Sequence, residues 1–379
     1  MHSPVRLATL ALASLIAAGS TGSVHAQTSP TDKAAFATRV DSLVKAYMAE
    51  THAPGLSVAV IRGRDTLMLA GVGLADRAKG KQASPATIYE IGSITKQFTS
   101  ASIMRLVDQH KLSIDDDMSK YLPQIPLHGN RVTIRHLLTH TSGIHSYTEV
   151  PAWQPHWGDE LTPDSIMGFV AKDTFDFAPG TRYKYDNSGY VLLGMVIEKV
   201  SGQTYAKFLE NELFKPLKLT HTSYCLSHPT DPAVASGYSK DSNSVKPATY
   251  LSLTQPFAAG ALCSTVGDLV MWERALTSGK VVSPESFALM STAATLNDGK
   301  KINYGFGLVP GEMSGHAFIS HSGGIPGFAT MEYYFPADTL AVVVFTNYDS
   351  ASPNVLAGNI ARIVYGLPPQ AAGRRGGGS

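Results

Sequence analysis

The sequence predicts an α+β fold: an antiparallel β-sheet flanked by N- and C-terminal helices, with a mainly helical subdomain inserted between its strands. Two observations support this prediction. Alternating or continuous apolar segments lie near both ends of the chain, at about residues 54–72 and 303–348, and such segments are typical of strands. Between them, at about residues 93–290, apolar residues recur three and four positions apart, which is the period of helices.

The first 26 residues have the features of a signal peptide. Arg6 precedes an apolar run from Leu7 to Gly19 that is too short to cross a bilayer, and Val24-His25-Ala26 offers the small residues of a cleavage site. No lipid-attachment cysteine directly follows this run, and no later run is long and apolar enough for a membrane span. We therefore expect an exported protein, periplasmic or secreted, with residues 27–366 as its folded domain.

The first elements of the domain are a helix and two strands. Ser29-Pro30-Thr31-Asp32 has the chemistry of a helix start, because a capping residue precedes a proline. One face of the helix then carries apolar residues, namely Phe36, Val40, Leu43, Val44 and Tyr47. Alternating Leu56, Val58 and Val60 predict a strand, and the segment from Thr66 to Ala70 predicts a second strand after a turn at Gly63.

The end of the chain mirrors its beginning. The segment from Ala329 to Phe335 alternates, and the continuous apolar run from Leu340 to Phe345 is typical of a central strand. Ser352-Pro353 begins a final helix with an apolar face formed by Leu356, Ile360, Ile363 and Val364. The tail, residues 367–379, is rich in glycine and arginine, and we expect it to be disordered.

Composition excludes some classes of function. Hydrophobic residues make up 44% and charged residues 16% of the chain, which indicates a globular protein. Lysine and arginine total 31 against 30 aspartates and glutamates, so no basic excess suggests nucleic acid as a partner. The two cysteines, Cys225 and Cys263, could form a disulfide in an exported protein or remain two buried thiols; the sequence leaves both open.

The stretch from Tyr89 to Phe98 holds the first catalytic candidate. Ser93 stands where an apolar helical pattern begins, and Lys96 follows three positions later, so both lie on one helix face. A serine hydroxyl becomes nucleophilic when a neighbouring base removes its proton, and a buried lysine can be that base. By itself, this tetrad is more simply interpreted as a capping serine and a solvated lysine.

Two later motifs reverse that interpretation. Tyr185-Asp186-Asn187 stands before a helical pattern, and His321-Ser322-Gly323-Gly324 stands before two strand-like segments. Taken alone, Tyr185 would be a packing ring, Asn187 a helix cap and His321 a surface histidine. Ser-x-x-Lys, Tyr-x-Asn and His-x-Gly in this order resemble the penicillin-recognising serine hydrolases, which include class C β-lactamases, DD-peptidases, D-aminopeptidases and related esterases. The flanking stretches that share the resemblance are residues 137–144, 190–194 and 304–307.

The resemblance runs from about Gly55 to Asn347, and it implies a role for each candidate residue. Ser93 would attack an ester or amide carbonyl, while Lys96 and Tyr185 would carry its proton to the leaving group. Asn187, His321, Gly323 and Gly324 would bind the substrate, with the N–H groups of Ser93 and Gly324 as the oxyanion hole. The family commonly has serine where Asp186 stands, so the local charge near Tyr185 differs here. No metal or organic cofactor is implied, and the partner is a small-molecule or peptide substrate.

The residue type at position 321, in the third motif, allows the possible substrate classes to be ranked. Many β-lactamases of the family have lysine at this position, which holds a substrate carboxylate at every physiological pH. We expect His321 to hold a carboxylate mainly when it is protonated. Histidine here is similar to DD-peptidase and D-aminopeptidase members, so hydrolysis of D-residue peptides ranks first, a broad esterase second and an efficient β-lactamase third. A non-catalytic penicillin-binding protein is a further alternative, whereas an α/β-hydrolase is disfavoured because no Gly-x-Ser-x-Gly occurs.

Other features receive structural interpretations. Asp115-Asp116-Asp117 is expected to be a solvated turn, and His136 and His140 to frame the site without binding metal, since no glutamate follows His136. Thr265 is expected to cap a helix. The segment from Tyr147 to Asp173 is loop-like, and its aromatic residues could line a substrate cleft or fix the loop to the core; we favour partial cleft lining.

Overall fold

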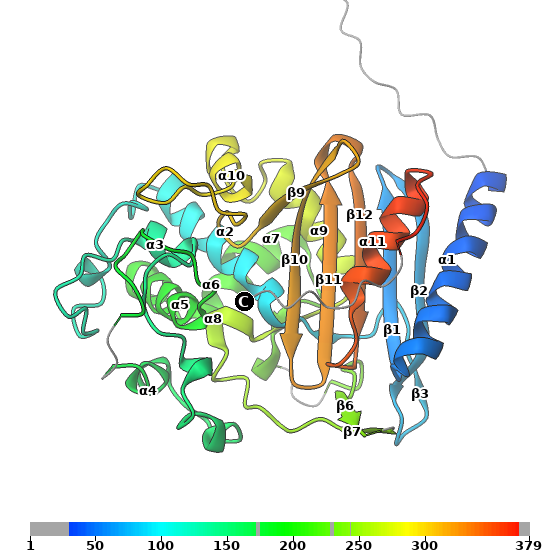
Figure 1. The fold of residues 1–379 in the computed structure, drawn as a ribbon, viewed down its shortest axis with the longest axis horizontal. Helices are drawn as coiled ribbons and strands as arrows, with labels where there is room; N and C mark the ends of the chain where they lie inside the picture. The colour runs from blue at the N-terminus through cyan, green and yellow to red at the C-terminus, as the bar shows by residue number, and fades with distance from the viewer. Residues whose placement is uncertain (1–29, 172–174, 228–230, 243, 371–379) are drawn as a thin grey trace, which may run out of the picture.

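The computed structural model describes residues 30–171, 175–227, 231–242 and 244–370, and it has the predicted α+β architecture (Figure 1). The predicted signal peptide and residues 371–379 of the predicted tail lie outside the described residues. A seven-stranded antiparallel sheet has the strand order β3-β2-β1-β12-β11-β10-β9. Its strands are β1 (Gly55–Arg62), β2 (Asp65–Asp76), β3 (Lys81–Gln82), β9 (Val309–Met313), β10 (His316–Ile325), β11 (Phe328–Phe335) and β12 (Leu340–Thr346).

The two terminal helices cover one face of this sheet, α1 (Pro30–Thr51) and α11 (Pro353–Val364) (Figure 1). Val40 and Val44 of α1 pack into one core cluster with Leu56 and Val58 of β1, whereas Ala59 belongs to the cluster on the other face. This alternation confirms the strand predicted from the sequence. The predicted cap residue Ser29 lies outside the described residues.

The continuous apolar run near the C-terminus forms β12, as predicted. It pairs with β1 on one side and with β11 on the other, so it is a central strand. Val342 and Val344 face the terminal helices, while Val343 and Phe345 face the helical part of the molecule. A strand that is buried on both faces has no polar side to alternate with, and this explains the unbroken run.

The helical part lies between β3 and β9 in the chain and packs beside and behind the sheet (Figure 1). Its α-helices are α2 (Thr95–Asp108), α3 (Ile134–Leu138), α4 (Pro163–Gly168), α5 (Asn187–Ser201), α6 (Tyr205–Leu209), α7 (Lys215–Leu217), α8 (Phe257–Gly260), α9 (Val266–Thr277) and α10 (Pro284–Ser291). The shorter turns are η1 (Gly92–Ile94), η2 (Met118–Lys120), η3 (Tyr147–Glu149), η4 (Gln154–His156), the π-helix η5 (Glu210–Phe214) and η6 (Cys225–Ser227), with η7 (Pro336–Asp338) joining β11 to β12. Thr265 caps α9 as predicted, because its side chain accepts from the Asp268 N–H.

Short strands within the helical part were not predicted. β4 (Tyr89–Glu90), β8 (Leu262–Ser264) and β5 (Ser223–Tyr224) form a small sheet, and β6 (Tyr238–Asp241) pairs with β7 (Ser244–Pro247). Strands this short carry too few residues to show an alternating pattern.

The strand that holds the third motif was not predicted. The His321–Gly324 motif lies within β10, and the two strand-like segments predicted after it form β11 and β12. The pairing of β10 with β9 ends at Ser320, while its pairing with β11 continues to Ile325. The edge from His321 to Ile325 therefore has no β9 partner. The glycines of the motif weakened the strand signal in the sequence.

Helix α2 also differs from its prediction, because it is buried on all sides and not on one face. Gln97, Thr99 and Ser102 are fully buried. Most of their polar groups are paired: Gln97 Oε1 accepts from Trp272 Nε1 at 3.0 Å, and the Thr99 and Ser102 hydroxyls donate to backbone carbonyls at 2.7 Å each, whereas Gln97 Nε2 has no hydrogen-bond partner among the described residues. Hydrogen bonding of this kind lets polar side chains lie inside a core. The helix that follows the candidate nucleophile is thus the central helix of the molecule.

The loop-like segment after Tyr147 holds two aromatic rings that face the core. Tyr147 and Trp153 are buried. The Trp153 indole donates to Gln255 Oε1 at 2.6 Å, and the Tyr147 hydroxyl donates to the Gln255 carbonyl at 3.2 Å. At these two positions the rings fix the loop to the core, so the prediction of cleft lining is wrong for them. Within the described parts of the chain, no helix combines the length and the apolar character needed to cross a membrane.

Candidate active site

The candidate nucleophile lies in a turn that only glycine permits. Ser93 is the middle residue of η1, and Gly92 before it has φ +52°. A Cβ at Gly92 would lie 2.9 Å from the Gly324 backbone nitrogen on β10. Left-handed φ and this close approach both require glycine. Ser93 is partly exposed between buried neighbours, so the turn presents it at a surface that the strand β10 borders.

Lys96, on the first turn of α2, is completely buried and has three acceptors for its ammonium group. Its Nζ donates to Ser93 Oγ at 3.0 Å, to Asn187 Oδ1 at 2.8 Å and to the Ala259 carbonyl at 2.8 Å. Burial lowers the pKa of Lys96 to about 7, an effect that the nearby Asp186 carboxyl opposes. Because burial disfavours the charged form, this lysine can hold or release a proton near neutral pH, 3.0 Å from the serine oxygen.

Tyr185 completes the group around the lysine. Lys96 Nζ lies 4.8 Å from the centre of the Tyr185 ring. Burial raises the pKa of Tyr185 well above its usual value, although an interaction with Ser93 lowers it. The Tyr185 hydroxyl is nevertheless buried without a hydrogen bond of regular geometry. The Tyr185 hydroxyl therefore interacts with Ser93 electrostatically, but it does not donate a regular hydrogen bond to any acceptor among the described residues.

Helix α5 positions Asn187 through its neighbour. Asp186 is the N-cap, since its carboxylate accepts from the backbone N–H groups of Ser188 at 2.7 Å and Gly189 at 3.0 Å. The alternative of Asn187 as the cap is therefore wrong, and its side chain is free for other contacts: Oδ1 accepts from Lys96, and Nδ2 donates to Thr148 Oγ1 at 3.2 Å. Burial raises the pKa of Asp186 to about 7, against the opposing effect of the two backbone donors and Lys96.

His321 lies on the opposite wall, and both of its nitrogens are engaged within the protein. Nδ1 is 2.6 Å from the Ser322 carbonyl oxygen, and Nε2 is 3.0 Å from the Tyr304 hydroxyl. A carbonyl can only accept, so we assign the proton to Nδ1, and Nε2 then accepts from Tyr304. Burial, with a smaller contribution from the Lys96 charge, lowers the pKa of His321 to about 4. His321 is therefore neutral at neutral pH, and its expected binding of a carboxylate in the protonated form stays a prediction for acidic pH.

Both histidines of the predicted frame are engaged in hydrogen bonds, and His140 lies beside Tyr185 of the site. His136 Nδ1 accepts from the Thr133 N–H in a capping box at the start of α3. His140 Nδ1 accepts from the Asp186 N–H at 3.0 Å, and its ring centre is 4.3 Å from that of Tyr185. His140 therefore supports the wall behind Tyr185.

Among the described residues, one group of side chains could together hold a metal ion, and it includes neither His136 nor His140. His145, Glu149 and Asp176 lie close enough together to share an ion. The Lys184 ammonium donates to both carboxylates at 2.7 Å each. An internal cation thus already pairs with both carboxylates of this cluster. The Asp115 to Asp117 segment is a turn, as predicted, with Asp115 paired to Arg135 and Asp117 capping η2.

Two adjacent glycines of β10 meet the Ser93 turn in different ways. A Cβ on Gly323 would lie 1.9 Å from the Ile91 carbonyl oxygen, whereas a Cβ on Gly324 would have no atom within 4 Å. Gly323 therefore lets the strand approach the turn, and Gly324 borders open space. This approach brings the backbone of Gly324 beside the turn that holds Ser93.

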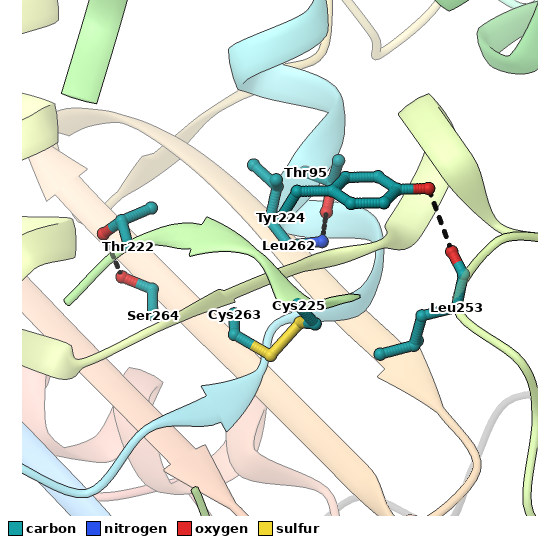
Figure 2. The surroundings of a disulfide bond; sticks show 8 residues. All are labelled: Thr95, Thr222, Tyr224, Cys225, Leu253, Leu262, Cys263 and Ser264. Atoms are coloured by element: carbon teal, nitrogen blue, oxygen red, sulfur yellow. Dashed lines mark hydrogen bonds between the residues drawn. A yellow bond between two sulfur atoms is a disulfide. The ribbon is translucent and has the colours of Figure 1, made fainter. Parts of the chain in front are cut away.

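A disulfide joins the strand that packs beside the Ser93 turn. Cys225 and Cys263 form a disulfide, which decides between the two alternatives left open by the sequence (Figure 2). Cys263 lies on β8, which also pairs with β4. On the same strand, the Leu262 N–H donates to Thr95 Oγ1 at 3.1 Å (Figure 2). The Leu262 carbonyl accepts from the Ile91 N–H at 2.9 Å. The cross-linked strand thus contacts the chain on both sides of Ser93.

Several groups at the site could not be identified from the sequence. The Ala259 carbonyl that binds Lys96 is a backbone group and leaves no signature in the residue type. Tyr304 belongs to a flanking stretch that was noted, but only the fold shows that it binds His321. Asp186 was noted as unusual for its charge, whereas its capping role required the helix boundary.

Comparison with known proteins gives consistent matches. A family model described as Beta-lactamase matches residues 40–365. "Penicillin-binding protein 4*" of Bacillus subtilis (strain 168) is 30% identical over 347 residues, which covers 85% of this chain and 74% of that protein. "Protein flp" of Staphylococcus aureus (strain N315) is 27% identical over 319 residues, with 82% of this chain covered; the match spans 63% of that protein, less than two thirds of its length.

Solved structures match over a similar range. The octameric penicillin-binding protein homologue from Pyrococcus abyssi has a TM-score of 0.78 and 31% identity, covering 88% of this chain and 78% of that chain. The D-stereospecific amidohydrolase from Streptomyces sp. has a TM-score of 0.74 and 29% identity, covering 85% of this chain and 97% of that chain. The family model, which spans residues 40–365, includes both walls of the candidate site.

Proposed function

This chain belongs to the β-lactamase family of serine hydrolases, and we propose that it cleaves amide and ester bonds through an acyl-enzyme on Ser93. In the first step, Ser93 Oγ bonds to the substrate carbonyl carbon while its proton passes to neutral Lys96. The C–N or C–O bond then breaks, and the proton passes on to the leaving group. In the second step, water bonds to the carbonyl carbon of the ester on Ser93 and gives up a proton. The bond between that carbon and Ser93 Oγ then breaks, the acid is released, and Oγ takes up a proton, which restores the enzyme.

The observation that carries this proposal is the contact between Lys96 Nζ and Ser93 Oγ at 3.0 Å. A general base must lie within hydrogen-bond reach of the proton that it removes and have a pKa near the working pH. Lys96 meets both conditions, since burial lowers its pKa to about 7. Tyr185, whose pKa is raised, stays protonated and therefore suits the transfer of a proton to the leaving group.

Other residues suit the stabilisation of the transition state. We assign the oxyanion hole to the N–H groups of Ser93 and Gly324, because the Gly92 turn brings this part of β10 against the serine. Asn187 holds Lys96 through its Oδ1, and its Nδ2 can donate to a substrate carbonyl in exchange for Thr148. The free edge of β10 from His321 to Ile325 can pair with an extended substrate.

We place D-residue amides and peptides first among the substrates. The support is the similarity to the D-stereospecific amidohydrolase of Streptomyces sp., which covers 97% of that chain. The names of the penicillin-binding relatives favour acylation by β-lactams as a side reaction. A broad esterase is the second candidate, and one observation favours it: His321 is engaged at both nitrogens and offers no charge to a substrate carboxylate.

A substrate panel tests the proposal. D- and L-alanine 4-nitroanilide, 4-nitrophenyl acetate and nitrocefin are compared by kcat/KM with the same enzyme preparation. We expect the D-anilide to exceed the L-anilide, with turnover of the ester and slow turnover of nitrocefin. Faster turnover of the ester than of either anilide, without a stereochemical preference, would favour the esterase. Covalent labelling by penicillin with no turnover of any substrate would favour the non-catalytic binding protein.

We also propose that the mature protein is exported. The Cys225–Cys263 disulfide supports an oxidising compartment, together with the signal peptide expected from the sequence. Mass spectrometry of the protein recovered from the periplasm and the medium tests this, and we expect its N-terminus to be Gln27. Recovery only from the cytoplasm with an intact N-terminus would contradict the proposal.

A further inference from the structure

Two glutamates face each other in the interior, between α9 and β11. Glu273 of α9 and Glu332 of β11 are each only 1% exposed, and their carboxyl groups interact with one another. Thr277 lies one helical turn after Glu273, and Tyr334 lies two residues after Glu332, so each shares a face with its glutamate. The Thr277 hydroxyl donates to the Tyr334 hydroxyl at 3.3 Å. The helix therefore runs against this face of the strand, and the two carboxyl groups meet at the interface.

The carboxyl groups of this acid pair, Glu273 and Glu332, have no donor to bind. None of their four oxygens has a hydrogen-bond partner of regular geometry among the described residues. As carboxylates, both groups could only accept, so neither could serve as the donor of the other. A buried acceptor without a donor is costly, and two ionised carboxylates in contact would also repel each other. One added proton removes both problems, because the protonated carboxyl then donates to its partner.

Within the described part of the sheet, no cation lies beside Glu332. In the register of the sheet, Glu332 lies between His321 on β10 and Val343 on β12, and Val343 pairs in turn with Ala59 on β1. His321 is the titratable group of this row. Burial lowers the pKa of His321 to about 4, and both of its nitrogens are engaged within the protein. Its neutral form therefore gives Glu332 no positive neighbour.

The described residues of the neighbouring helices do not balance the acid pair either. Arg274 of α9 donates to a backbone carbonyl outside the pair, and the Lys96 ammonium on α2 has its three acceptors elsewhere. Tyr334 is the other titratable neighbour, and burial raises its pKa. Burial also raises the pKa of Glu273, and burial together with the charge of Glu273 raises the pKa of Glu332.

We propose that Glu273 and Glu332 share at least one proton at neutral pH and form a pH-sensitive link between α9 and β11. While the proton is present, the O–H of one carboxyl donates to an oxygen of the other, and the helix stays bound to the strand. When the proton is lost at higher pH, two negative charges remain in contact without a cation. Their repulsion and the cost of keeping them away from water then favour the unfolded chain, so the acid pair limits the stability of the fold at alkaline pH.

Ionisation of the acid pair destabilises the folded state as pH rises. In the unfolded chain both glutamates ionise at their ordinary pKa of 4.5, whereas the folded pair keeps its proton to higher pH. Folding above about pH 5 therefore takes up at least one proton, and the equilibrium constant of unfolding rises about tenfold per pH unit for each such proton. The contribution of the pair to stability is complete below the unfolded pKa and is lost as pH rises through the folded pKa.

Denaturant unfolding at several pH values between about 5.5 and 7.5 tests the link. Wild type is compared with the double variant Glu273→Gln and Glu332→Gln, whose amides keep the shape and donate without a charge. Relative to the double variant, the unfolding constant of wild type should rise by about tenfold or more per pH unit, since all other titrating groups are common to both proteins. Glu312→Gln, at an exposed position of β9, is the control and should keep the wild-type slope. Equal slopes in wild type and the double variant would overturn the inference.

Infrared spectroscopy of the native wild-type protein decides the question if the double variant does not fold. With ¹³C at the glutamate carboxyls, the spectrum at neutral pH should contain the C=O band of a protonated glutamic acid. Burial also raises the pKa of Glu90 to about 7, so Glu90→Gln is the control, in which the band should persist. Absence of the band from wild type, or its complete loss in Glu90→Gln, would overturn the inference.

A bound cation in place of the proton would give a different result. Unfolding of the wild type at a fixed pH is measured with EDTA, with added calcium, and with potassium in place of sodium at equal ionic strength. We expect the same unfolding constant in each case, because a proton balances the acid pair. A stabilisation by one of these cations that disappears in the double variant would assign the site to a metal ion and overturn the shared proton.

Discussion

The two walls of the site each bury a basic side chain, with opposite consequences. Lys96 starts from a pKa of 10.5, and burial lowers it to about 7. His321 starts from 6.5, and burial lowers it to about 4. The same desolvation thus converts the lysine into a base that works at neutral pH and makes the histidine a permanently neutral group there. The wall formed by Ser93 and Lys96, the serine wall, therefore suits proton transfer. The β10 wall, which holds His321, suits the recognition of uncharged substrate groups.

Hydrogen bonds reinforce this contrast. Lys96 binds Ser93 and Asn187, which are both groups that a substrate can reach or displace. His321 binds the carbonyl of its own neighbour and Tyr304, which are internal partners. We infer that a substrate can replace the hydrogen-bond partners of Lys96 during a reaction but not those of His321. Each of the following changes tests the role of one of the two walls.

The largest effects are expected on the serine wall, from Lys96→Met and Tyr185→Phe. Each should lower the acylation rate by about two to four powers of ten, because each removes a proton carrier. The double variant should lose less than the sum of the two, since the residues share one proton path. Stopped-flow acylation with 4-nitrophenyl acetate measures the rates. Losses of activation free energy that add strictly in the double variant would show that Lys96 and Tyr185 act independently, without a shared proton path.

A pair of neighbouring glycines tests how β10 meets the serine wall. Gly323→Ala should lower kcat/KM by about a hundredfold, because its Cβ would collide with the Ile91 carbonyl and move the oxyanion donors. Gly324→Ala keeps its N–H and meets no atom within 4 Å, so it should change kcat/KM by less than about threefold. Circular dichroism melts control for unfolding, and equal losses in both variants would contradict the assigned geometry.

The pH profile distinguishes the two basic groups directly. For a neutral ester, kcat/KM should rise as pH increases through about 7, because only deprotonated Lys96 can accept the Ser93 proton. Asp186 raises the pKa of Lys96, so Asp186→Asn should move the midpoint to lower pH while preserving the helix cap.

His321→Gln is the matched change on the other wall. It should leave the midpoint of the pH profile in place, since His321 is already neutral above pH 5. A midpoint that moves with His321 and not with Asp186 would reverse the assignment of the two walls.

Removal of the disulfide should have the smallest effect on the chemistry. The double variant Cys225→Ala and Cys263→Ala opens a loop with a sequence separation of 38 residues, which costs about 3–4 kcal/mol in the free energy of unfolding. Activity at low temperature should fall only a few-fold, because the strand β8 still pairs with β4 and β5. Denaturant unfolding and kcat/KM measure both quantities, and a loss of activity as large as that of Lys96→Met would give the disulfide a catalytic role.

Residue patterns predicted the long strands of the sheet because these strands follow from local hydrophobic periodicity. The alternation of Leu56, Val58 and Val60 and the apolar run from Leu340 follow from which strand faces are buried, and both were predicted correctly. Ser93, Lys96 and Asn187 were placed together by motif order, and their hydrogen bonds show that they meet.

Features that depend on burial and tertiary contact were not predictable. The charge state of His321 depends on the complete enclosure of its ring and on Tyr304, which is 17 residues away in the chain. The uniform burial of α2 depends on neighbours on every side, so its sequence resembles that of an ordinary amphipathic helix. Short strands such as β4 and β8 form because the long elements bring them together, without a pattern of their own.

Rapid-quench mass spectrometry of the intact protein tests the central claim most directly. The wild-type protein is mixed with 4-nitrophenyl acetate, quenched within milliseconds and digested. We predict a mass increase of one acetyl group on the peptide that contains Ser93, and no adduct in folded Ser93→Ala. An adduct that persists in the folded variant, or that maps to a residue other than Ser93, would contradict the account.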